Sequence, residues 1–136
     1  MPKIRTITRE HMKPLIEPYG LAEAVRAGEL LYVAGQTGLD ERHQLAPGGL
    51  KAQATQAFRN IRQIIELAGA RPENLVHLTW YLADAPTARS FIEDALDVTA
   101  ARNEVFPGVV TGSTAVRVKA LLTPELLVEI QAIAAL

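Results

Sequence analysis

The residue types best suited to chemistry lie near the C-terminal end of the chain. Glu129 is the lone carboxylate in the largely apolar run Val128–Ala134. Alternation in this run is typical of a half-buried strand, and it places Glu129, Gln131 and Ile133 on one face. A carboxylate there either faces water or occupies a pocket, where it can accept and donate a proton. The sequence leaves both interpretations open.

A second alternating segment, TGSTAVRV (Thr111–Val118), comes shortly before this run. One of its faces carries Ser113, Ala115 and Arg117. A turn signal at Thr123-Pro124-Glu125 separates the two segments, so we expect them to form an antiparallel pair. No histidine or acid can be paired with Ser113 from the sequence, and a serine-hydrolase triad is therefore unsupported.

Three motifs in this chain resemble those of the RidA/YjgF family of reactive-intermediate (enamine/imine) deaminases, also labelled endoribonuclease L-PSP-like. VEIQAIA (Val128–Ala134) is similar to the closing strand of the family, while EPYG (Glu17–Gly20) and AGQTG (Ala34–Gly38) are similar to two earlier motifs. The resemblance spans roughly residues 15 to 134. It departs at TGSTAVRV, where Ser113, or Thr114 in a shifted register, stands in the place of the arginine of the family.

The resemblance implies a role for each matching residue. Glu129 would handle water or protons, and Tyr19, otherwise a loop aromatic over the core edge, would close the pocket. The remaining implied substrate contacts are Ser113, Thr114, Gly35, Ala115 and Arg117.

The missing arginine predicts altered specificity. An arginine holds a substrate carboxylate through two charged hydrogen bonds, whereas a serine hydroxyl supplies neither the charge nor a second donor. We therefore expect weak activity on small imino acids unless Arg102 or Arg117 supplies the charge. The resemblance implies an enamine/imine deaminase-like hydrolase of small metabolites with non-archetypal specificity. The alternative is a non-catalytic metabolite-binding or regulatory module that uses an intersubunit cleft.

Two helices are expected to support these strands. Apolar residues spaced three and four apart predict a helix over residues 51–68, with Gly69 as its stop signal. A second helix is predicted over residues 88–105, with a capping box at Ser90 and Glu93. Its expected buried side comprises Phe91, Ile92, Ala95, Leu96 and Thr99.

The expected strands are residues 3–8 at an edge, two strands around the turn Ala27-Gly28-Glu29, residues 74–83 and the two C-terminal segments. In the strand over residues 74–83 we expect Val76, Leu78, Trp80 and Leu82 on one face. Two helices of this kind are best buried on one face of a single mixed sheet, so we expect one α+β domain over residues 1–136. The resemblance implies a chorismate-mutase-like fold with about six strands.

The sheet face opposite the helices is expected to be apolar. It should carry Leu75, Tyr81, Ala115, Leu127 and Ile133. A large exposed apolar surface indicates a partner. The resemblance implies that the partner is a second copy, in a homotrimer with a small-molecule site at the subunit interface.

Composition argues against several other classes of protein. The 136 residues carry a net charge of −1 and no basic run, so no nucleic-acid partner is expected. There is no cysteine, and His11, His43 and His77 lack metal-ligand spacing, so we expect neither a metal nor a cofactor. The N-terminal stretch lacks the apolar core of a signal peptide, and no run is long enough to cross a membrane. The expected compartment is the cytoplasm.

Overall fold

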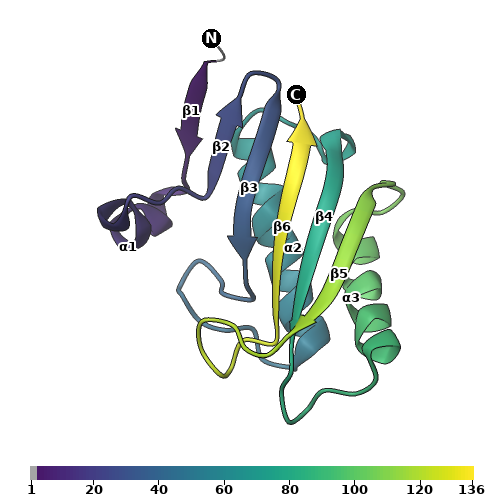
Figure 1. Ribbon diagram of the computed structural model, residues 1–136. Helices are drawn as coiled ribbons and strands as arrows, with labels where there is room; N and C mark the ends of the chain where they lie inside the picture. Colours follow the sequence, from purple (N-terminus) through teal and green to yellow (C-terminus); the bar gives the residue numbers. More distant parts are fainter. Residues whose placement is uncertain (1–2) are drawn as a thin grey trace.

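The computed structural model describes residues 3–136. All six strands belong to one sheet, in the order β1-β2-β3-β6-β4-β5 (Figure 1). Short 3₁₀ turns lie at Glu10–Met12, Glu17–Tyr19 and Pro72–Asn74. The helices and strands are β1 (Ile4–Ile7), α1 (Lys13–Ile16), β2 (Ala24–Ala27), β3 (Leu30–Gln36), α2 (Leu50–Leu67), β4 (Leu75–Ala83), α3 (Phe91–Val105), β5 (Gly112–Val118) and β6 (Val128–Ala135).

β6 occupies the interior of the sheet, antiparallel to both β3 and β4. β5 pairs in parallel with β4, which lies between β5 and β6. The predicted antiparallel pairing of the two C-terminal strands is therefore wrong. The predicted turn does form, with Leu126 N–H bonded to the Thr123 carbonyl, but it belongs to a connection that passes the end of β4.

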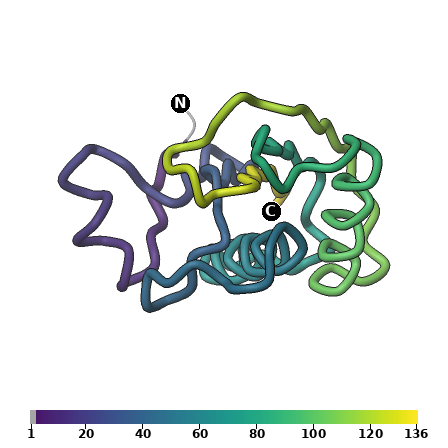
Figure 2. Tube along the Cα trace, turned by 90° about the horizontal axis from the view of Figure 1, so that it is seen from below, coloured from purple at the N-terminus to yellow at the C-terminus, as the bar shows by residue number. Residues whose placement is uncertain are grey.

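α2 and α3 lie on the same side of the sheet (Figures 1 and 2), as predicted. The core between these layers is centred on Phe58 of α2, which makes edge-to-face contacts with Trp80 of β4 and with Phe106, at centroid distances of 6.4 and 6.3 Å. Such contacts add to the hydrophobic free energy of burial and restrict how the rings can pack. The two helices therefore cover one face of the sheet, and the opposite face stays uncovered within one chain.

The predictions for the first half of the chain are largely confirmed. α2 begins and ends within one residue of the predicted helix, and Gly69 follows it at φ 87°. β2 and β3 form the predicted hairpin, with Gly28 at φ 63°, a conformation that glycine adopts without steric cost. β1 is the predicted edge strand.

α3 differs from its prediction in both start and orientation. It begins at Phe91 because Ser90 caps it, and its buried residues are Asp94, Val98, Ala101 and Val105. Ile92 and Leu96, predicted to be buried, are 71% and 61% exposed. The side of α3 that packs inward carries Val98 and Ala101, whose small side chains allow α3 and α2 to approach closely. The side that carries the bulkier Ile92 and Leu96 faces outward.

The uncovered face of the sheet is more polar than predicted. An irregularity in β4 between Leu75 and His77 turns Leu75 into the core and Val76 outward, and Val76 is 43% exposed. Ala115 lies on the helix side because it pairs with the buried Trp80. Tyr81 and Ile133 are on the open face as predicted. Within residues 3–136, no helix has the length and apolar character needed to span a membrane.

The capping box of α3 gives a direct test of how this helix starts. The Ser90 hydroxyl accepts a hydrogen bond from the Glu93 N–H at 3.2 Å. Replacing Ser90 with alanine leaves that N–H unpaired, and we expect a loss of about 1 kcal/mol in unfolding free energy. Ser90→Asp keeps an acceptor and should lose much less. Equal urea midpoints for Ser90→Ala and the wild type would contradict this assignment.

Candidate functional site

The centre of the candidate site is the contact between Glu129 of β6 and Gly35 of β3. The register between these strands shifts between Val33 and Gln36, which marks a bulge at Gly35. A Cβ placed on Gly35 would lie 2.8 Å from the carboxyl carbon of Glu129 and closer still to one of its oxygens. Glycine at this position therefore makes room for the carboxylate.

Burial controls the protonation of Glu129. It raises the pKa of the Glu129 carboxyl above its ordinary value of 4.5, and no other cause contributes to the shift. No salt bridge among the described residues involves Glu129. A partly buried carboxyl without a fixed cation can accept a proton and later return it.

Polar side chains from β4 and β6 surround Glu129 on the open face of the sheet. Tyr81 is directly opposite Glu129, and its hydroxyl lies 3.0 Å from the Gln131 side-chain oxygen, to which it donates a hydrogen bond. The sequence placed Gln131 on the same face as Glu129 and Tyr81 on the sheet face opposite the helices, but it did not assign either residue to the site. The alternation of polar and apolar residues in each strand was the available signal for these two residues. Their contact depends on the register between β4 and β6, which alternation does not give.

The residues at the arginine position lie on two different faces. Ser113 pairs with Leu78, whose side chain is in the core, so Ser113 is on the helix side of the sheet. Thr114 pairs with Thr79 and therefore shares the open face with Glu129. Within one chain, Thr114 and not Ser113 shares that face with Glu129.

The two candidate arginines also lie on the helix side. Arg117 donates to Asp94 at 3.1 Å and to the carbonyl oxygens of Ala83 and Arg89, and Asp94 is 3% exposed. Arg102 donates to the Val109 carbonyl and to the Thr111 hydroxyl, which is 3.4 Å from the Ser113 hydroxyl.

Thus Arg102 is linked to Ser113 through the Thr111 hydroxyl, whereas Arg117 is paired with the buried Asp94, which also pairs with Arg89. Ala115 is beside Trp80 and away from Glu129.

Tyr19 lies at the end of the turn Glu17–Tyr19, before Gly20 at φ 73°, and is 79% exposed. No hydrogen bond joins Tyr19 to Glu129 in the described part of the chain. Of the predicted site residues, one chain therefore brings Glu129 and Gly35 into contact and places Thr114 on the same sheet face, two strands away from Glu129. Ser113, Ala115 and Arg117 lie on the other face.

The architecture of a six-stranded mixed sheet with two helices on one face recurs in solved structures. One is a member of the YjgF/YER057c/UK114 family from Mycobacterium tuberculosis, with a TM-score of 0.77, 27% identity and coverage of 98% of this chain and 100% of that chain. The fold is thus the chorismate-mutase-like fold expected from the sequence.

The sequence itself matches the family described as Endoribonuclease L-PSP over residues 12–136. A RutC family protein from Pyrococcus abyssi is 32% identical over 98% of each chain. The mouse 2-iminobutanoate/2-iminopropanoate deaminase is 41% identical, but over 51% of this chain and 50% of its own length. The chain belongs to the endoribonuclease L-PSP family, the same family as RidA/YjgF.

The raised pKa of Glu129 predicts a specific pH dependence of stability. The folded state holds the Glu129 proton more tightly than the unfolded state, so this stabilising contribution is complete below the ordinary value of 4.5. It is lost as the pH rises through the folded-state pKa. Urea unfolding should therefore show the wild type losing stability relative to Glu129→Gln across that window.

The exposed Glu41→Gln variant controls for the loss of one charge. A constant difference between wild type and Glu129→Gln at all pH values would contradict the raised pKa.

Proposed function

We propose that this protein hydrolyses imines or enamines of small metabolites to the 2-oxo compound and ammonia, with a specificity different from that of family members that carry the arginine. Membership of the family and the deaminase named among its relatives support this reaction class. The single observation that carries the proposal is the unpartnered, partly buried carboxyl of Glu129 above Gly35. Hydrolysis of an imine requires a group that first accepts a proton and then donates it, and a carboxyl of this kind can do both.

The proposed steps use Glu129 first as a base and then as an acid. Ionised Glu129 takes a proton from a water molecule as the water oxygen attacks the imine carbon. The carboxyl then returns that proton to the nitrogen, which gives a carbinolamine. Glu129 next moves the hydroxyl proton to the nitrogen, the carbon–nitrogen bond breaks, and ammonia leaves as the carbonyl forms. Enamine substrates first become imines when carbon gains a proton and nitrogen loses one. Because these substrates are already reactive, positioning them supplies much of the rate.

We further propose that the complete site requires a second copy of the chain. Ser113 and Glu129 lie on opposite faces of the same sheet, so one ligand cannot contact both within one chain. A homotrimer would pair the open face of one subunit with the β5 edge of the next, and Tyr19 would close the site. The uncovered face with its exposed Tyr32 and Val116 supports such a contact. We assign this activity to the cytoplasm.

The anchor for the substrate carboxylate is proposed to be Arg102 with Ser113, which lie on the same side of the sheet, while Thr114 would contact a ligand on the open face. Arg102 already reaches Ser113 through the Thr111 hydroxyl. Its position differs from that of an arginine on β5 itself, which would favour substrates other than the smallest imino acids. Arg117 is less suitable because it pairs with the buried Asp94.

A second candidate function is a non-catalytic module that holds a small metabolite in the same cleft. The absence of an arginine at position 113 favours this alternative, since a serine binds a carboxylate more weakly. The deaminase would convert its ligand to product, whereas the binding module would not.

Release of 2-oxo acid from imines generated by an amino-acid oxidase separates the two. We expect wild-type turnover, and a fall of about 10²–10⁴-fold in kcat/KM for Glu129→Gln, because proton transfer contributes about that much. The Glu41→Gln variant should retain full activity. Thermal stabilisation by metabolites without any turnover would instead support the binding module.

A further inference from the structure

Gln53 of α2 is a buried polar residue whose side-chain hydrogen bonds go to the connection that leads into β6. Its side-chain oxygen accepts from the Leu127 N–H at 2.9 Å, and its side-chain nitrogen donates to the Glu125 carbonyl at 3.0 Å. Gln53 is 4% exposed. The amide therefore pairs with the main chain as a neighbouring strand would, two residues before Glu129.

Most of this connection is exposed. In residues 119–127 only Leu126 is buried. Apart from Gln53, no side chain outside the connection hydrogen-bonds to it within the described part of the chain. Exposed connections are more mobile than the strands they join. The two hydrogen bonds of Gln53 therefore fix the main chain at the point where β6 begins.

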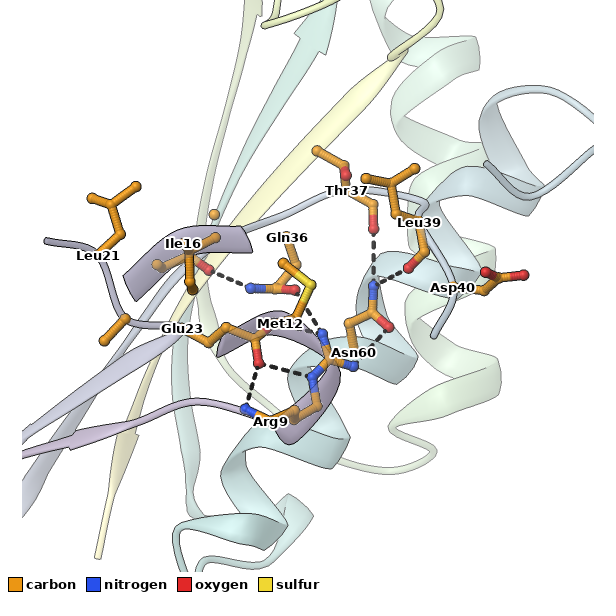
Figure 3. Close-up of a pocket in the computed structure, with 13 residues that line it drawn as sticks. Arg9, Met12, Ile16, Leu21, Glu23, Gln36, Thr37, Leu39, Asp40 and Asn60 are labelled. Atoms are coloured by element: carbon orange, nitrogen blue, oxygen red, sulfur yellow. Dashed lines mark hydrogen bonds and ion pairs between the residues drawn. The ribbon is translucent and has the colours of Figure 1, made fainter. Parts of the chain in front are cut away.

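Gln53 also touches the segment that leaves β3. A Cβ placed on Gly38 would lie 2.7 Å from the Cα of Gln53, so glycine allows this segment to pass directly against α2. Asn60 lies about two turns further along α2. Its amide nitrogen donates to the carbonyl oxygens of Thr37 and Leu39, on either side of Gly38, at 3.1 and 2.8 Å (Figure 3). These two hydrogen bonds hold the segment against Gln53.

The exit of β3 and the entry of β6 therefore meet at Gln53. Gly35 comes three residues before Gly38, so both members of the Glu129–Gly35 contact lie close along the chain to a point that Gln53 holds. Gln53 belongs to α2 on the helix side of the sheet, whereas Glu129 is on the open face. Gln53 thus acts on Glu129 through the main chain and not through contact with a ligand.

We propose that Gln53 is the positioning residue for Glu129: it holds the start of β6 against the exit of β3, so that the carboxyl stays above Gly35. The inference rests on the proposed function, in which Glu129 moves the protons, and adds the residue that keeps this carboxyl in place. Proton transfer depends on placement, and a misplacement of about 1 Å reduces a rate by as much as about 10²-fold.

Gln53→Met tests this role, because methionine is similarly long and unbranched but makes neither hydrogen bond. We expect the Glu129 carboxyl to gain contact with water in this variant. Its pKa, measured by ¹³C NMR titration of the full chain, should fall toward the ordinary value of 4.5. In the assay of 2-oxo acid release, kcat/KM should fall at least about tenfold.

The matched control is Ile65→Val, which removes one buried carbon from the same helix, about 18 Å along its axis from Gln53. This variant should lose stability and keep the wild-type Glu129 pKa and kcat/KM. Gly38→Ala reaches the same contact from the other side, in case Gln53→Met does not fold. Its added methyl group displaces the exit of β3 from Gln53, and the Glu129 pKa should again fall.

A Glu129 pKa that stays at the wild-type value in Gln53→Met and Gly38→Ala, or that shifts equally in Ile65→Val, would overturn the positioning role. Turnover by the wild type reports on the proposed function separately. If the wild type hydrolyses imines and Gln53→Met changes neither the pKa nor kcat/KM, the positioning role is wrong and the function stands. If Gln53→Met shifts the pKa and the wild type hydrolyses no imine, the deaminase function is wrong and the positioning role stands.

Discussion

The close contact between the Glu129 carboxylate and the backbone of Gly35 is the constraint on which the site depends. An unpaired carboxyl is costly to bury, and here the protonated form reduces that cost. The bulge in β3 turns Gly35 toward β6, and the missing side chain leaves space for the carboxyl. A destabilising feature held in this way is typical of functional sites, where the surrounding structure fixes a group that would otherwise move into water.

The remainder of the fold holds this contact in place. β6 lies between β3 and β4, so both neighbours of Glu129 are hydrogen-bonded strands and not loops. On the opposite face, Ile130 next to Glu129 is fully buried in the core with Phe58 of α2. Sites on packed strands are positioned more precisely than sites on loops. Arg9 pairs with Glu23 and also donates to Asn60 and Gln63 of α2, so it fixes the N-terminal segment against that helix.

Periodicity in the sequence was enough to predict the elements, the buried face of α2 and the alternation in β5 and β6, but not which strands are neighbours. α2 and the β2–β3 hairpin follow from local patterns, as does the alternation that separates Glu129 from Ile130. The place of β4 between β5 and β6 depends on long-range pairing that alternation does not encode. For the same reason, alternation placed Ser113 and Thr114 on opposite faces of their strand but did not show which of them shares the face of Glu129. The outward stripe of α3 at Ile92 and Leu96 depends on how α3 packs against α2, which its own composition does not reveal.

The most direct test of the central claim is the pKa of the Glu129 carboxyl, measured by ¹³C NMR titration of the wild type and of Gly35→Ala. We expect the wild-type value to lie above the ordinary 4.5, because the carboxyl is partly buried and unpaired. In Gly35→Ala the added methyl group occupies the position of the carboxyl, so the group should move into water and its pKa should fall toward the ordinary value. A wild-type pKa at or below 4.5, or one that Gly35→Ala leaves unchanged, would contradict the account.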